Sequence, residues 1–207
     1  MSTLKSNSVL RMNYLAILTA IVIFLQCFGG FLKLPFLATS FNLALIPITI
    51  GAILLGPRAG AWLGLVCGTV ILIYGVTGVD LFTHLLFEIR PFVTVLICLV
   101  KTTVAGFLAG LVYRLLAKRT HWGALFATAA TVPIVNTALF ILGGLPIGQD
   151  IIEVGRQLEF YPEGMSAFVF IIVGCVTVNF FFFELLPNLV LTPAVQRIIA
   201  IVTPKKK

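Results

Sequence analysis

Residues 42–77 decide the fold, and their sequence is NLALIPITIGAILLGPRAGAWLGLVCGTVILIYGVT. Two apolar runs flank the turn GPRAG at 56–60. Pro57 cannot continue the first helix, and Gly56 can adopt the backbone conformation that ends a helix tightly. Because runs this apolar recur along almost the whole sequence, the stretch predicts a membrane hairpin rather than a hairpin of a soluble protein. Its second helix carries small residues at four-residue spacing, a ridge on which another helix can pack closely: Gly60, Gly64 and Gly68.

The composition extends this interpretation to the whole chain. Of the 207 residues, 60% are hydrophobic and only 10% are charged, with a mean hydropathy of +1.14. Such a chain has too little polar surface to cover a soluble globule, so an integral membrane protein is expected. The four cysteines are widely spaced in apolar surroundings without a CxxC pair, which favours packing roles over metal ligation or disulfides.

The apolar runs predict an all-α membrane protein, a single domain over residues 1–207 built as a bundle of six transmembrane helices. The run from 91 to 117 is too long for one span, since 27 residues of helix measure about 40 Å against a hydrocarbon core of about 30 Å. We therefore expect a re-entrant or interfacial outer segment over 80–97, between helices 3 and 4. The helices are expected at 12–28, in the two halves of the hairpin, and at 98–117, 122–142 and 165–186, with a loop at 31–41 and a polar loop at 143–164.

The basic residues predict the orientation. An even number of spans puts both termini on one side, and ten of the fourteen basic residues then share that side: Lys5, Arg11, Arg58, Arg114, Lys118, Arg119, Arg197, Lys205, Lys206 and Lys207. Lys33, Arg90 and Arg156 lie in the opposite loops. By the positive-inside rule the termini are cytoplasmic. Membrane orientation also explains the net charge of +7 without a nucleic-acid partner.

The sequence contains no constellation typical of an enzyme. It lacks HExxH, a GxSxG serine with a partner histidine, and a Walker motif, so neither catalytic residues, nor a bound metal or cofactor, nor direct use of ATP is predicted. If the chain moves a solute uphill, a partner must supply the energy. Ala16 and Ala20 in the first helix form AxxxA, a spacing that permits close approach of a partner helix in lipid. The same spacing recurs elsewhere, at Ala105/Ala109 and Gly106/Gly110.

Several of these features together resemble one family. The basic amino tail, the AxxxA pair, the Gly-Pro-x-x-Gly hairpin and six short spans in about 200 residues are similar to the substrate-binding S component of an energy-coupling factor (ECF) vitamin transporter. Within that family, Ile46-Pro47-Ile48 before the turn and Val135-Asn136-Thr137 before Gly143-Gly144 look most like pantothenate-type members. One departure is that Val100-Lys101 stands where those members have Pro-Arg.

The resemblance implies a function and partners. Such a subunit binds a water-soluble vitamin near its outer face in the bacterial cell membrane. It then topples on a module of one transmembrane coupling subunit and two ATPase subunits. The resemblance also assigns Ala16 and Ala20 to the docking face for the coupling subunit, and it adds Thr137 to the expected binding residues.

Depth along the predicted helices indicates the other binding residues. Lys101 and Asn136 lie roughly 5 and 9 Å below the outer boundary, and Gln26 and Tyr74 lie near the same layer, whereas Asn179 and Glu184 fall toward the cytoplasm. Lys101 is costly in lipid and should face a cavity or a partner, although a lysine reaching to the interface is the alternative. Arg90 in the outer segment is a second possible anion partner. Asn136 could equally serve an interhelical hydrogen bond.

Two other classes of protein share the size and hydropathy. A structural six-span protein of the rod-shape machinery would need neither an outer cavity nor a docking face. A channel or carrier acting alone would need polar residues at all depths, and the inner half of this chain is poor in them. Within the transporter interpretation, pantothenate is the vitamin expected first, and folate, riboflavin and cobalamin are the alternatives.

Overall fold

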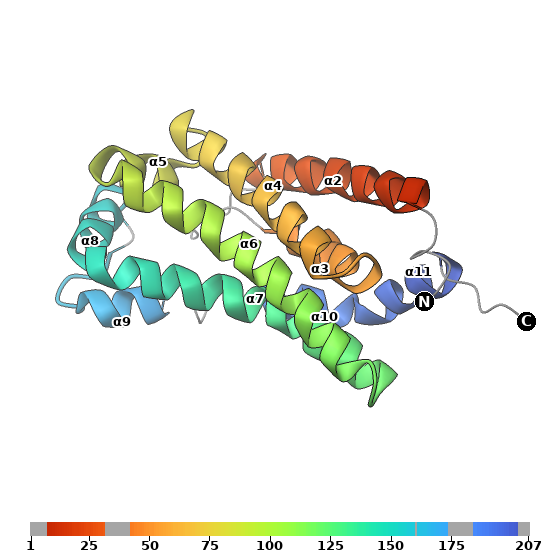
Figure 1. The fold of residues 1–207 in the computed structure, drawn as a ribbon. Helices are drawn as coiled ribbons and strands as arrows, with labels where there is room; N and C mark the ends of the chain where they lie inside the picture. The colour runs from red at the N-terminus through yellow and green to blue at the C-terminus, as the bar shows by residue number, and fades with distance from the viewer. Residues whose placement is uncertain (1–7, 32–41, 160, 174–183, 203–207) are drawn as a thin grey trace, which may run out of the picture.

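The computed structural model of the protein describes residues 8–31, 42–159, 161–173 and 184–202, which are helical with short connections and contain no strand. Four long helices lie alongside one another in a bundle, namely α2 (Ser8–Phe31), α4 (Pro57–Val76), α6 (Pro91–Leu116) and α7 (His121–Gly144) (Figure 1). Each is long and apolar enough to cross a membrane. The predicted all-helical architecture is confirmed.

Shorter helices complete the two ends of the bundle. At one end lie α5 (Leu81–Ile89), the 3-10 turn η1 (Leu145–Ile147), α8 (Gly148–Gln157) and α9 (Ala167–Ile172). At the other end lie α11 (Thr192–Val202) and the start of α2, while α3 (Leu45–Leu54) and α10 (Leu186–Val190) pack against the long helices (Figure 1). Apolar side chains from α2, α3, α4 and α6 form the central core.

The hairpin forms as the sequence predicts. α3 ends at Leu54, Gly56 has a φ of 95°, and Pro57 is the first residue of α4. That positive φ favours glycine, and proline fits the first helical position because its missing N–H needs no partner there. The Arg114 guanidinium lies over Gly56, so a side chain at position 56 would also collide with it.

The predicted glycine ridge is confirmed, and its partner is α6. A methyl group on Gly60, Gly64 or Gly68 would overlap the backbone carbonyl oxygens of Gly106, Thr102 and Cys98, respectively. The two helices therefore touch through backbone atoms at three levels. Close contact of this kind stabilises helix association where lipid supplies no hydrophobic driving force.

The predicted start of the fourth helix near Cys98 is wrong, because α6 begins at Pro91. The segment over 80–97 divides into the separate helix α5 and the first turns of α6, which runs unbroken for 26 residues from Pro91. Asp80 caps α5 by accepting a hydrogen bond from the N–H of Thr83 at 3.1 Å. Arg90 leaves the helical region, and Pro91 then restarts the chain as a new helix. The length argument ignored that a long helix can tilt or extend beyond the hydrocarbon.

The predicted polar loop over 143–164 is mostly wrong too, because its first part is helical. α7 passes through η1 directly into α8. In α8, Ile151, Ile152 and Val154 are buried, while Glu153 and Arg156 are exposed, so the segment is an amphipathic helix with one apolar face. That face packs against α5 and α9 and closes this end of the bundle.

The sixth predicted span, over 165–186, lies only partly within the described residues, as α9 and the start of α10. Most of the predicted loop over 31–41 and Cys175 lie outside them. Cys67 and Cys98 are buried and Cys27 is half-buried, all three as free thiols. These thiols agree with the expected packing roles.

Candidate functional site

Polar side chains meet inside the apolar bundle, where each must find a partner because lipid and core atoms offer none. Gln26, Asn136 and Glu184 are 2%, 3% and 4% exposed. We call this group the interior polar cluster; it comprises Gln26, Asn42, Cys67, Asn136, Thr137 and Glu184.

Glu184 is the acceptor at the centre of the cluster. The Asn136 Nδ2 group donates to Oε1 at 3.0 Å and lies 3.3 Å from Oε2, and the Thr137 hydroxyl donates to Oε2 at 3.0 Å. Asn42 supplies a further side-chain hydrogen bond. Several donors on one carboxylate compensate the loss of water that burial imposes.

Lys101 faces the cluster from α6. It is half-buried, and its charge acts on both the Glu184 carboxyl and the Cys67 thiol. Its Nζ atom lies 5.1 Å from the centre of the Phe140 ring on α7, a cation–π distance. Among the described residues no carboxylate oxygen lies within 4 Å of this ammonium.

Gln26 on α2 and Asn42, which precedes α3, both lie beside Cys67 on α4. The Cys67 Sγ atom of α4 lies 3.5 Å from Oε1 of Gln26 and 3.7 Å from Oδ1 of Asn42. A thiol is a weak donor, so these contacts leave both amide oxygens with acceptor capacity.

The sequence-based depth of Glu184 is wrong, since the structure brings it level with Asn136 rather than toward the cytoplasm. The depth of Glu184 depends on where α7 and the helices after it meet. α7 continues past the predicted end at 142, and Gly148 packs directly against Ala167, the first residue of α9. The start of α9 is therefore level with Gly148, beyond the predicted end of the fifth span. Asn179 lies outside the described residues.

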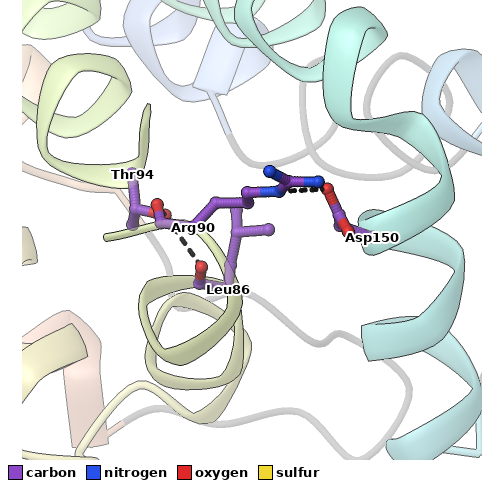
Figure 2. Close-up of polar contacts among 4 residues, drawn as sticks. All are labelled: Leu86, Arg90, Thr94 and Asp150. Atoms are coloured by element: carbon purple, nitrogen blue, oxygen red, sulfur yellow. Dashed lines mark hydrogen bonds and ion pairs between the residues drawn. The ribbon is translucent and has the colours of Figure 1, made fainter. Parts of the chain in front are cut away.

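Arg90 lies away from the cluster, at the corner between α5 and α6 (Figure 2). Its Nε atom donates to Oδ2 of Asp150 on α8 at 2.8 Å, in an ion pair whose arginine side chain is 56% exposed. The Thr94 hydroxyl stabilises this corner because it lies within hydrogen-bond distance of two backbone carbonyl oxygens, that of Arg90 at 2.9 Å and that of Leu86 at 3.1 Å. Eleven residues of helix separate Arg90 from Lys101, roughly 16 Å along the axis.

Tyr74 also lies apart from the centre, near the end of α4, where it hydrogen-bonds with the Cys27 thiol. Of the six predicted binding residues, the structure thus brings four to the cluster or its edge: Gln26, Lys101, Asn136 and Thr137. Sequence reasoning missed Asn42, Cys67 and Glu184. The signal for Glu184 was available, because an acidic residue within an apolar span is by default a candidate for function.

Ala16 and Ala20 lie on an exposed face of α2. The equivalent small residues of α6 are used inside the molecule, since Ala105 and Ala109 are fully buried and Gly106 packs against Gly60. The AxxxA pair of α2 therefore remains free within the described structure.

The sequence model of the family described as "ECF transporter, substrate-specific component" matches residues 10–196. The match covers most of the chain, which therefore belongs to this family. The family is one of transporters rather than enzymes; its members bind a small-molecule substrate and associate with an ECF module. Comparisons with characterised proteins and with solved structures find no significant match.

Proposed function

We propose that the chain is the high-affinity substrate-capture subunit of an ATP-driven ECF importer in the bacterial cell membrane, and that its substrate is a water-soluble vitamin, in the first place pantothenate. The observation that carries the proposal is the family match together with Lys101 beside a buried polar cluster. A coupling subunit and two ATPase subunits supply the energy.

Lys101 is proposed to bind the carboxylate of the vitamin. Stripping a carboxylate of water costs several kcal/mol unless a cation meets it, and Lys101 is the basic residue that acts on the cluster. No carboxylate within 4 Å already holds its ammonium in the described structure, so it is available to an incoming anion.

Asn136, Thr137 and Gln26 are proposed to orient the remainder of the vitamin. An amide side chain both donates and accepts, so Asn136 can pair with the hydroxyl and amide groups of pantothenate. Arg90 and Tyr74 stay proposed binding residues of a second rank, because their present partners are Asp150 and Cys27.

The proposed membrane arrangement is one domain with six spans and both termini in the cytoplasm. In its support, the start of α2, the α3–α4 turn, the α6–α7 turn and α11 all lie at one end of the bundle (Figure 1). That end carries Arg11, Arg58, Arg114, Lys118 and Arg197, while Arg90 and Arg156 belong to elements of the opposite end.

Two measurements test the vitamin. Mass spectrometry identifies the small molecule that copurifies with the protein, and calorimetric titration with pantothenate measures its affinity. Saturable heat and thermal stabilisation are expected. Absence of both for the wild type excludes pantothenate, and recovery of folate, riboflavin or cobalamin identifies the vitamin instead. A chain that retains no small molecule would favour a structural role.

A further inference from the structure

The interior polar cluster contains a buried acceptor without a hydrogen-bond partner in the described structure. Asn136 is 3% exposed, and its Nδ2 group is used by Glu184, yet its Oδ1 atom has no hydrogen-bond partner in the described structure. An unsatisfied buried oxygen costs about 1–3 kcal/mol. Such a group needs an explanation, and an absent ligand with a donor is a direct one.

Two neighbouring acceptors have shared or weak donors. Glu184 receives side-chain hydrogen bonds from Asn136, Thr137 and Asn42, and the Nδ2 group of Asn136 is shared between its two oxygens, at 3.0 and 3.3 Å. On the α2 side, the Gln26 oxygen faces the Cys67 thiol, which is a poor donor. The unmet demand inside the bundle is therefore for O–H or N–H groups.

Charge decides which kind of donor fits. Lys101 acts on Glu184 through space, so its ammonium lies within electrostatic reach of the subsite. A cationic donor would lie beside this ammonium, and two like charges repel strongly in a low-dielectric interior. A neutral hydroxyl or amide N–H satisfies the acceptors without that repulsion.

We infer that Asn136 Oδ1 and the Glu184 carboxylate form a donor-recognising subsite, which takes neutral hydroxyl groups of a ligand whose anionic end lies toward Lys101. The inference rests on the proposed function and narrows its substrate class to small carboxylates that also carry hydroxyls. Glu184 becomes a specificity-determining residue, because a ligand without hydroxyls leaves buried acceptors unpaired.

Three compounds test the carboxylate-binding end and the hydroxyl-binding end of the site separately on the wild-type protein. Pantothenate carries a carboxylate, an amide and two hydroxyls. N-pivaloyl-β-alanine keeps the carboxylate and amide but has no hydroxyl, and panthenol keeps the hydroxyls and amide but has no carboxylate. We expect both analogues to bind roughly 10- to 100-fold more weakly than pantothenate in calorimetric titration. N-pivaloyl-β-alanine binding as tightly as pantothenate overturns the inference.

The variant Glu184→Gln localises the effect. Glutamine replaces one acceptor oxygen by a donor that opposes the Nδ2 group of Asn136, so pantothenate affinity should fall roughly 10- to 100-fold while the already weak affinity for N-pivaloyl-β-alanine stays unchanged. Glu153→Gln on the exposed face of α8 is the matched control and should change neither. An equal loss of affinity for both compounds would mean that Glu184 does not recognise the hydroxyl groups, and the inference fails.

Failure of the proposed vitamin is distinguishable from failure of the subsite. If pantothenate gives no heat with the wild type, the vitamin is wrong, and the subsite is then tested on the small molecules that copurify with wild type and with Glu184→Gln. Loss from the variant of a compound that carries hydroxyls supports the subsite. Equal retention by both proteins, or a retained compound without a hydroxyl, overturns it.

Discussion

Lys101 is the basic residue that acts on the buried Glu184, whose hydrogen-bond partners Asn136 and Thr137 are uncharged. Truncating one member of a desolvated charge pair costs roughly 2–5 kcal/mol of binding, because the partner charge is left without compensation. Lys101→Met should weaken pantothenate binding by about this amount in calorimetry. Arg90→Met serves as the comparison, since Arg90 pairs with Asp150 at the surface. Binding that survives Lys101→Met but is lost in Arg90→Met would move the anion site to the α5–α6 corner.

Asn136 donates to the Glu184 carboxylate and is proposed to offer its own oxygen to the ligand. Asn136→Ala removes both functions, and the partner left unpaired should cost about 1–3 kcal/mol of pantothenate affinity. Thr131→Ala on the same helix is the matched control, because its hydroxyl bonds only to the backbone carbonyl of Ala127. Equal affinities of Asn136→Ala and wild type would contradict the proposed contact.

At the residue scale, the sequence predicted which polar residues lie inside the apolar bundle better than it predicted which of them are in contact. Lys101 and Asn136 stood out because polar groups in apolar helices need partners. The partner itself, Glu184, was misplaced because its depth depended on the register between two helices. An error of a few residues in one helix end shifts a side chain by several ångströms, since each residue rises 1.5 Å.

The pairing of α4 with α6 is the element-scale feature that the sequence revealed most directly. Gly64 lies at its centre, where a Cβ would overlap the carbonyl of Thr102. Gly64→Val should separate the helices and destabilise the protein by about 1–3 kcal/mol or more, the usual cost of overpacking. Thermal unfolding in detergent measures it. Leu65→Val, on the exposed side of the same helix, should leave the midpoint nearly unchanged. Equal midpoints for both variants would show that the contact is not needed.

The boundaries of α5, α6 and α8 could not be predicted from apolarity alone. Pro91 was visible in the sequence, but its role as the first residue of α6 depends on the backbone conformation of Arg90. The α8 segment was assigned to a loop because its charged residues lower its average apolarity, although Ile151 and Ile152 supply a buried face. Periodicity rather than average hydropathy would have found this helix.

The proposed arrangement of the whole molecule in the membrane rests on the basic residues at one end of the bundle. Cysteines substituted for Arg58 and Lys118 should resist an impermeant thiol reagent added to intact cells, and cysteines at Glu88 and Glu159 should react. The background is a chain without native cysteines. Labelling at position 58 from outside would falsify the orientation, and with it the outer placement of α5 and α8.

The proposed docking on the coupling subunit also concerns the whole molecule. Because Ala16 and Ala20 are exposed, tryptophan at either position should fit the isolated chain but block close helix approach. Ala16→Trp and Ala20→Trp should abolish energised uptake and leave vitamin affinity nearly unchanged. Leu115→Trp on the exposed side of α6 is the control. Copurification of both alanine variants with the coupling module at wild-type yield would refute the docking role.

The backbone contact between α4 and α6 limits where movement can occur during transport. Contacts made by long side chains can slide, because rotamers change as the helices shift. At Gly60, Gly64 and Gly68 the surfaces that meet are carbonyl groups and α-carbons, which have no rotamers. The two helices should therefore move together as one rigid body. Any change of shape that admits or releases the solute should then come from movement of α2, α7 and the helices at the ends relative to the α4–α6 pair.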